Sequence, residues 1–467
     1  MRGTARMMVP FGAACVLCAV LALELGGPGS RDALVFSTWG TPGEIASFRR
    51  LIDRYNATRH PLHPVRLAHA EQYQYTERLM VEAAAQGLPD VIHLDRNDVP
   101  LFARMGLLSD LGPRIARDTS FHRGAYFPEL WEGCARGTSV FAVPHNFSTL
   151  VLYYNRDQFA AAGIAPPDST WTWQTLVDAA GRLTRREADS STARYGCLMQ
   201  IAFSAMLLQN GGRVLNAAMD SCVIASPECA GALAFAVDLS EKYRVSWSML
   251  AQNMQWDDMF AGGRLSMIAN GRWALVPYVR TMGEGAVGVA PLPRGLLRRG
   301  AVACHVMAVS AQSPKQEEAW EFVRYLAGAE GERLVAESGS AIPALRAAAM
   351  TDDVLRRGGV DGGVFVDALR GAAPWPFVQG PYLSGFALQS RFEGAVRRVL
   401  LHEAAPLESL RMMEEDVNAL IHSARDVPPP RRFAGSALFY LLSALCAAAL
   451  AAAARSLIRR RRAAASG

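Results

Sequence analysis

Cysteine, lysine and long apolar runs are all scarce in this sequence. Their scarcity limits the structural classes to which the protein can belong. Eight cysteines in 467 residues exclude a disulfide-dense scaffold. Charge-free apolar runs long enough to span a bilayer occur only near the two ends, which excludes a polytopic membrane protein. With 51% hydrophobic and 19% charged residues the chain is not disordered, and its length suggests about two or three folding units.

Positive charge comes almost entirely from arginine, and its excess lies at the C-terminal end. The formal net charge is +5, to which residues 431–467 contribute +7 and residues 1–30 contribute +1, so residues 31–430 carry about −3. A nucleic-acid-binding body would carry a basic excess instead. We therefore expect no nucleic-acid partner.

The N-terminal segment has the pattern of an export signal. Arg2 and Arg6 precede a charge-free apolar run at 7–23, which is the order of a basic region and a hydrophobic region in a secretory signal. The run is also just long enough to remain as an anchor. Residues 1–30 are therefore interpreted as a signal peptide or an N-terminal signal anchor, and cleavage is left open.

The C-terminal segment has the pattern of a membrane span. Residues 434–454 carry no charge and lie between Arg431-Arg432 and the cluster Arg459–Arg462. About 20 apolar residues cross a bilayer as a helix, and the more basic flank stays cytoplasmic. We predict a Pro/Arg stalk at 427–433, a transmembrane helix at 434–454 and a basic cytoplasmic tail at 455–467. The preceding body would then be exported and tethered to the cell membrane, on its periplasmic or extracytoplasmic side.

The cysteines of the body indicate neither a metal site nor a complete set of disulfides. An odd number in an oxidising compartment leaves at least one free thiol. Cys222 and Cys229 bracket a short segment and are the favoured pair, although the sequence leaves the bond open. No CxxC pair or histidine spacing suggests zinc, and we expect no metal and no cofactor. The five cysteines of the body are Cys134, Cys197, Cys222, Cys229 and Cys304.

Strand and helix patterns alternate at the start of the body. Buried strands are predicted at 34–36, 63–67 and 90–95, with amphipathic helices at 45–55 and 73–85 between them. Such alternation favours an α/β lobe with a mainly parallel sheet. Ligands in such sheets bind beyond the carboxyl ends of the strands. Trp39 and Asp95 occupy two of those ends.

The remainder of the body mixes further strands with long helical stretches. Thr170 or Thr172 is a plausible N-cap for a helix, and from there to about residue 285 the chain is expected to be mostly helical. The other predicted elements are strands at 141–144, 150–155, 287–293 and 302–309, a helix at 315–326 and two terminal helices within 387–422.

Seven segments occur in an order that resembles one protein family. They are STWG at 37–40, GLPDVIHLD at 87–95, FARMGLLSDL at 102–111, LYYNRDQFAAAGIAPPDSTWTWQTL at 152–176, MFAGGRLSMIANGRW at 259–273, PLP at 291–293 and SPKQEEAWEFVRYLAG at 313–328. Together they resemble the extracellular solute-binding proteins of family 1, the maltodextrin- and sugar-type binding subunits of ABC importers. The resemblance covers residues 34–425, but a C-terminal membrane span is not the usual layout of that family.

The resemblance implies an α/β, two-lobe periplasmic-binding-protein fold of type II with a ligand cleft between the lobes, followed here by the C-terminal transmembrane helix. It implies that the chain passes between the lobes more than once. The expected division is lobe 1 at 31–145, lobe 2 at 146–295, a return to lobe 1 at 296–345, and lobe 2 with the C-terminal helices at 346–426.

The resemblance also suggests ligand-binding residues, each with a structural alternative. Trp39 matches a cleft position but could be a core aromatic, and Asp95 could cap the next helix. Trp273 closes a segment that supplies a stacking aromatic, and Trp375 resembles a late aromatic contact. The other candidates are His145 and Asn146 (ligand or hinge), Tyr153 (at most one of Tyr153 and Tyr154 facing the cleft), Trp256 (ligand or interlobe packing) and Arg272 (acidic ligand group or surface salt bridge).

The leading interpretation is a tethered protein that captures a sugar, an oligosaccharide or another small polar solute and delivers it to the permease subunits of an ABC transporter. The alternative is a tethered sensor that uses the same cleft to signal to a membrane partner. No serine-hydrolase elbow, zinc-protease motif or phosphate loop occurs, so no enzyme activity is expected. The solute and the permease-contacting residues are not predictable from the sequence.

Overall fold

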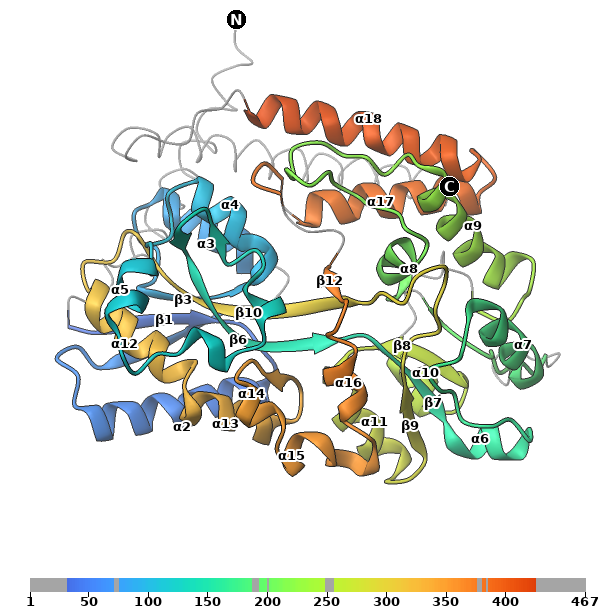
Figure 1. The fold of residues 1–467 in the computed structure, drawn as a ribbon, viewed down its shortest axis with the longest axis horizontal. Coiled ribbons are helices and arrows are strands. Elements are labelled where there is room, and N and C mark those ends of the chain that lie inside the picture. The colour runs from blue at the N-terminus through green and yellow to red at the C-terminus, as the bar shows by residue number, and fades with distance from the viewer. Residues whose placement is uncertain are drawn as a thin grey trace, which may run out of the picture.

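The protein is described by a computed structural model that covers residues 32–70, 75–186, 193–199, 201–247, 256–375, 380–383 and 385–425. Two α/β halves lie side by side, joined by strands that cross the middle of the molecule (Figure 1). The predicted signal segment and the predicted membrane span at 434–454 lie outside the described residues. Within those residues, no helix is both long and apolar enough to cross a membrane.

The first half is built on a mixed sheet with the strand order β11-β6-β10-β3-β1-β2. β1 pairs in parallel with both β2 and β3, as the alternating pattern predicts, but β10 runs antiparallel to β3 and to β6. The prediction of a mainly parallel sheet is therefore wrong for half of it, because β10 enters from the second half and runs the opposite way. The strands are β1 (Leu34–Thr38), β2 (Val65–His69), β3 (Val91–Asp95), β6 (Ala142–Thr149), β10 (Ala301–Val309) and β11 (Ile342–Pro343).

Helices cover this sheet, and α2 and α13 both reach the cleft. The side chain of Thr41 accepts from the backbone N–H of Glu44, and the Glu44 carboxylate accepts from that of Thr41, which is a capping box. The predicted apolar face, Ile45 to Tyr55, is buried. The helices of this half include α2 (Pro42–Arg59), α3 (Tyr75–Ala84), α4 (Val99–Arg104), α5 (Gly112–Arg117), α12 (Gln316–Leu326) and α13 (Ala329–Ser338).

The second half has a smaller antiparallel sheet of β7 (Val151–Asn155), β8 (Met267–Asn270) and β9 (Val287–Ala290), in the order β8-β7-β9. β8 lies in the region expected to be mostly helical, and its short apolar sequence does not distinguish a buried strand from a helix. Thr172 is the N-cap of α7, one of the two residues proposed. The helices include α6 (Arg156–Ala161), α7 (Trp173–Leu183), α8 (Phe203–Gln209), α9 (Pro227–Glu241), α10 (Trp256–Ala261) and α11 (Leu275–Met282).

The last part of the chain contacts both halves. α17 (Gly385–Leu400) and α18 (Pro406–Arg425) are the two predicted terminal helices, and they lie side by side along the top of the molecule (Figure 1). α18 packs on α9 of the second half, while Arg104 of α4 donates to the carbonyl of Ala424 at its far end. Before them come α14 (Arg346–Ala349), α15 (Asp352–Leu355), α16 (Gly363–Asp367) and β12 (Ala373–Pro374).

Three passages of the chain connect the halves. The first lies at Leu150, between β6 and β7, and the second is the loop from β9 to β10. The third runs from β11 through α16 and β12 to α17. Paired strands β6 and β10 therefore form the central connection, with β12 pairing alongside β10.

The five cysteines of the described body are all buried free thiols. Cys222 and Cys229, the favoured disulfide pair, are not bonded in the structure. Burial is the main cause that raises the pKa of the Cys222 thiol to about 12, with the neighbouring Cys229 adding to the shift. A thiol that ionises so reluctantly reacts slowly in thiol–disulfide exchange, because the thiolate is the reactive form.

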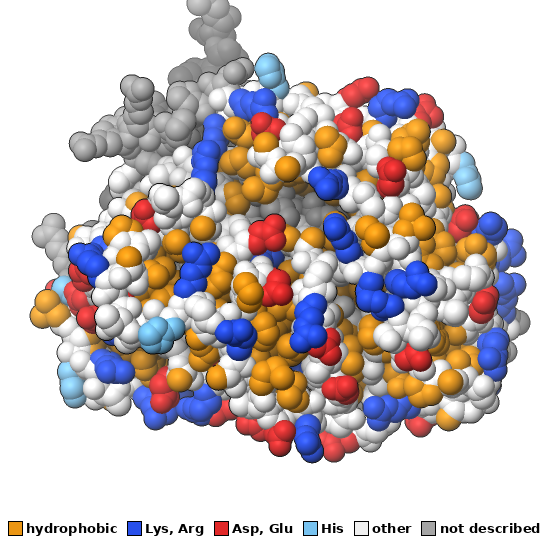
Figure 2. Space-filling model, viewed as in Figure 1, with side chains coloured by type: hydrophobic (Ala, Val, Ile, Leu, Met, Phe, Trp, Pro, Cys, Tyr) orange, Lys and Arg blue, Asp and Glu red, His pale blue; other side chains and the backbone are white. Residues whose placement is uncertain are grey.

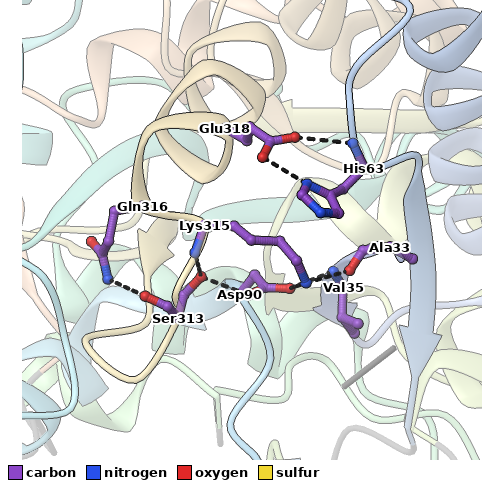
Figure 3. A network of polar contacts seen from close by, with 8 residues as sticks. All are labelled: Ala33, Val35, His63, Asp90, Ser313, Lys315, Gln316 and Glu318. Atoms are coloured by element: carbon purple, nitrogen blue, oxygen red, sulfur yellow. Dashed lines mark hydrogen bonds and ion pairs between the residues drawn. The ribbon is translucent and has the colours of Figure 1, made fainter. Parts of the chain in front are cut away.

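A buried ion pair fastens the start of β1 to the sheet (Figure 3). The Asp90 carboxylate accepts from the backbone N–H of Val35 at 2.8 Å and from Oγ of Ser313 at 2.6 Å. The ammonium group of Lys315 lies 3.6 Å from the same carboxylate and donates to the carbonyl of Ala33 at 2.7 Å. Both charged side chains are more than nine-tenths buried, which makes the pairing costly to break.

Replacing Asp90 with alanine is expected to lower the free energy of unfolding by about 3–5 kcal/mol, because it removes the buried carboxylate that faces the Lys315 ammonium and accepts from Val35 and Ser313. Urea unfolding measures this loss. The control is Asp367→Ala, which removes a largely exposed partner of Arg370 and should cost less than about 1 kcal/mol. Equal losses in the two variants would contradict the assignment of Asp90 as a buried anchor.

Candidate functional site

A cavity of about 530 Å³ lies between the two halves. Its walls come from the start of α2, the ends of β3, β6 and β10, one face of α13, the segment after β8 and the segment after β12. Six of the predicted site residues line it: Trp39, Asp95, His145, Asn146, Trp273 and Trp375. These six come from five separate stretches of the chain, so the cavity exists only in the folded protein.

A β-bulge places two adjacent residues of β6 on the cavity. Neighbouring residues of a regular strand face opposite sides of the sheet. In β6, Asn146 is opposite His305 and Pro144 is opposite Val306, so His145 is an extra residue without a partner on β10. A bulge of this kind re-aims a side chain. Both His145 and Asn146 consequently line the cavity.

Three polar side chains form a row across the sheet where it meets the cavity. His305 of β10 is directly opposite Asp95 on one side and Asn146 on the other. Directly opposite residues in antiparallel strands point to the same face. The row therefore offers a carboxylate, an imidazole and an amide within reach of one bound molecule.

His93 presents a buried acceptor behind this row. The hydroxyl of Thr38 donates to the carbonyl of Trp39 at 3.0 Å, so its oxygen must accept from Nδ1 of His93, which lies 2.8 Å away. The proton of His93 is thereby assigned to Nδ1, leaving a lone pair on Nε2. Nε2 is buried and has no hydrogen-bond partner among the described residues. Trp39 stacks on this imidazole with ring centroids 4.4 Å apart.

The three histidines of the cavity are held neutral. Burial lowers the pKa of His93 well below its ordinary value, and it lowers the pKa of His145 to about 3. Burial also lowers the pKa of His305, although the nearby Asp95 carboxylate opposes that shift. A neutral imidazole both donates and accepts a hydrogen bond, as a hydroxyl group does. The described residues contain no group of three histidine, cysteine or acidic side chains placed to hold a metal ion.

A buried carboxyl group lies behind His145. Oε1 of Glu332, on α13, is 3.9 Å from Nδ1 of His145, and neither atom has a hydrogen-bond partner in the described part of the chain. The other oxygen accepts from the backbone N–H of Leu345 at 3.2 Å. Burial raises the pKa of Glu332 well above its ordinary value. The pair is therefore stable as a neutral acid beside a neutral imidazole.

Two tryptophans contribute to the cavity from outside the first sheet. Trp273 is 39% exposed, although large aromatic side chains are normally buried. A Cβ atom at Gly271 would lie only 2.1 Å from its ring, so the absence of a side chain there lets the ring lie against the backbone. Trp375 follows β12 and packs partly against the core of the second half. These rings supply flat apolar surface opposite the polar row.

Three predicted site residues do not line the cavity. Tyr153 is fully buried, and its hydroxyl donates to the carbonyl of Gly271 at 2.8 Å. Trp256 begins α10 and is partly buried against the core. Arg272 is 1% exposed, lies over the ring of Phe365 and donates to a backbone carbonyl. Their contact with ligand remains a prediction without support from this cavity.

Several lining residues have no signal in the sequence that singles them out. His93 and His305 look like ordinary strand residues, and Glu44 looks like a helix cap. The paired registers of β3, β10 and β6 bring the histidines together, and those registers are not predictable from one chain. The lining residues that were missed include Thr41, Glu44, Ser47, Phe48, His93, Ser148, His305, Ser338 and Ser340.

Residues 39–333 match the family model described as bacterial extracellular solute-binding protein. The match includes the start of α2, all of β3 and the polar row. The chain belongs to this family.

Relatives and solved structures of the solute-binding family support the same fold. The chain is 28% identical over 309 residues to an uncharacterized lipoprotein from the oleD 5' region of Streptomyces antibioticus, covering 61% of this chain and 64% of that protein. It is 25% identical to a probable ABC transporter-binding protein of Deinococcus radiodurans, covering 62% and 71%. A solute-binding protein of Thermotoga lettingae, bound with α-D-tagatose, matches with a TM-score of 0.71 and 22% identity, covering 84% of this chain and 100% of that one.

The buried His145 predicts an acid-sensitive stability. The unfolded chain takes up this proton near pH 6.5 and the folded chain near pH 3, so between these values the unfolded state binds more protons and stability falls as pH falls. Native protein should lose about 2 kcal/mol more than His145→Gln between pH 7 and pH 5. Urea unfolding at the two pH values measures the difference.

The control for this prediction is His122→Gln, because His122 is exposed. This variant should lose as much stability as native protein over the same pH range. The raised pKa of Glu332 acts in the opposite direction, but that group is present in all three proteins. A His145→Gln variant with the native pH dependence would contradict the assignment of a buried neutral imidazole.

Proposed function

We propose that this protein is a membrane-tethered, extracytoplasmic receptor that captures a sugar or oligosaccharide between its two lobes and delivers it to an ABC permease. The observation that carries the proposal is the composition of the cavity. Aromatic rings of Trp39, Trp273 and Trp375 line it together with the polar row of Asp95, His305 and Asn146. No enzymatic step is part of the proposal.

Sugars match this composition because they are amphipathic in a particular way. The C–H face of a pyranose is apolar and stacks on an aromatic ring, while its hydroxyl groups both donate and accept hydrogen bonds. A cleft that offers flat rings and a few placed polar groups satisfies both needs. An unpaired polar group in such a site costs about 1–3 kcal/mol, which gives specificity for the hydroxyl pattern.

Closure of the cleft follows from the connections between the lobes. The first lobe provides Trp39 and Asp95, whereas Trp273 comes from the second, so a bound sugar would contact both lobes at once. Contacts made only in the closed form stabilise that form by the difference in affinity. β6 and β10 cross between the lobes and are suited to act as the hinge.

The relatives support the transport role. One of them is named a probable ABC transporter-binding protein, and one structural neighbour was solved with the monosaccharide tagatose. Figure 2 shows acidic and basic side chains interspersed over one face of the molecule, without a continuous basic area for nucleic acid. A lipoprotein relative is consistent with attachment to a membrane, for which this chain would use residues 434–454.

Replacing Trp273 with alanine is expected to weaken sugar binding at least about tenfold, because it removes a stacking surface. A thermal-shift screen of native protein against mono- and oligosaccharides, polyols and sugar phosphates identifies the ligand, since binding raises the melting temperature. Isothermal calorimetry then compares the variants. Trp273→Phe should retain part of the affinity, because phenylalanine keeps an aromatic face.

The matched control is Leu62→Ala, which removes an exposed apolar side chain, 84% exposed, outside the cavity lining. It should bind like native protein. Gly271→Ala should behave like Trp273→Ala, because the added Cβ forces the ring away. Native affinity in Trp273→Ala would show that this ring does not contact the ligand. A melting temperature unchanged by every solute would count against sugar capture.

Tethering is tested with a chain that ends at residue 426. The full chain should remain with the membrane after carbonate extraction, whereas the shortened chain should be released. Release of both proteins would contradict tethering by residues 434–454. Loss of uptake of the identified sugar in a deletion strain supports delivery to a permease, whereas unchanged uptake with an altered transcriptional response would favour the sensor.

A further inference from the structure

The charged side chains that line the cleft are both acidic, Glu44 and Asp95. Asp95 uses Oδ1 to accept from the backbone N–H of Asn97 at 2.9 Å, and its second oxygen has no recorded partner within the described chain. Glu44 is a second carboxylate in the lining. Nε2 of His93 is a third acceptor, since Thr38 occupies Nδ1. A ligand must bring donors to satisfy the second oxygen of Asp95 and Nε2 of His93.

Cationic side chains do not balance these acceptors. Among the described residues, no lysine or arginine lines the cavity, and the internal segments outside the described ranges contain neither residue type. Arg272 and Arg357 lie outside the lining, and each donates to backbone carbonyl oxygen. The lining histidines are also neutral, because burial lowers their pKa.

Aromatic faces add to the same preference. Trp39, Phe48, Trp273 and Trp375 all line the cavity. The face of an aromatic ring carries partial negative charge, so a cation over it is attracted and an anion is repelled. Carboxylates combined with aromatic rings in one cavity therefore favour a ligand that carries a protonated amine.

We propose that the cleft selects polyhydroxy solutes bearing a protonated amine, such as amino sugars or aminocyclitols, over neutral isosteres, and that it rejects phosphorylated or carboxylated sugars. The selectivity rests on the proposed function, because it describes the ligand of the same cleft. Asp95 is the specificity-determining residue. It belongs to the polar row, and one of its carboxylate oxygens accepts no hydrogen bond within the described chain. Glu44 contributes less, because Thr41 and Ser340 already occupy both of its oxygens.

The test compares sugars that share a ring and differ in charge. Calorimetry at about pH 6.5 and low ionic strength measures native protein with glucose, glucosamine and glucose 6-phosphate. It then uses cellobiose, the β-1,4-linked glucosamine dimer and cellobionate. The amine-bearing member of at least one set should bind about tenfold more tightly than the neutral member, and the anionic member should bind least.

Two further measurements attribute the preference to Asp95. Asp95→Asn keeps the capping acceptor but loses the charge, so affinity for the amine-bearing sugar should fall more than affinity for the neutral sugar, and the amine preference should shrink to within about twofold. Asp367→Asn, in an exposed ion pair, should retain the native preference. Raising the salt concentration should reduce the amine preference of native protein. This measurement does not depend on whether a variant folds.

The outcomes distinguish this inference from the proposed function. Neutral sugars that bind as tightly as their amine analogues, or anionic sugars that bind best, overturn the inference and leave sugar capture standing. An amine preference that persists in Asp95→Asn shows that Asp95 is not the specificity-determining residue. Absence of binding by every member of both sets, beside a receptor that responds to its own sugar, overturns the inference and also counts against sugar capture.

Discussion

The pairing of β6 with β10 is the interaction on which the rest of the structure depends. These strands lie in the middle of the first sheet and lead into the second half, so one set of hydrogen bonds both builds a lobe and connects the two. The bulge at His145 lies within this pairing. Without it, His145 and Asn146 would face opposite sides of the sheet, and one of them would leave the cavity.

The second constraint is that the histidines of the cleft are buried and therefore uncharged. Their neutral state decides which hydrogen bonds the cleft can make. Histidines packed against Trp39 and Phe48 cannot carry a proton at neutral pH, because the surroundings do not solvate it. They remain dual donor–acceptor groups, which suits hydroxyls. The carboxylate of Asp95 also lines the cavity, and only one of its oxygens accepts a hydrogen bond within the described chain. The contrast with Asp90 is instructive, since that carboxylate is fully occupied in holding the fold.

The order of patterns along the chain predicts most of the fold but only part of the site. The strands of the first lobe, α12 and the two terminal helices follow from local apolar periodicity, and the capping role of Thr172 follows from residue type. Trp273 was predictable as a lining residue because it closes one of the family segments, and Trp375 because it resembles a late aromatic contact. The antiparallel course of β10 was not predictable, because it depends on which lobe the chain returns from. Tyr153 and Arg272 are buried away from the cavity lining, and neither residue type nor position in the sequence distinguishes such packing from a ligand contact.

The sequence by itself determined the family, the alternation of strands and helices in the first lobe, and the chemical types available at the strand ends. These features depend on local patterns and on the order of motifs, which a single chain displays. Only the tertiary structure decided which side chains meet. The row of Asp95, His305 and Asn146 joins residues that are far apart in the chain, through strand register and one bulge. Register shifts of a single residue reverse the face of every side chain, so no local pattern could have specified that row.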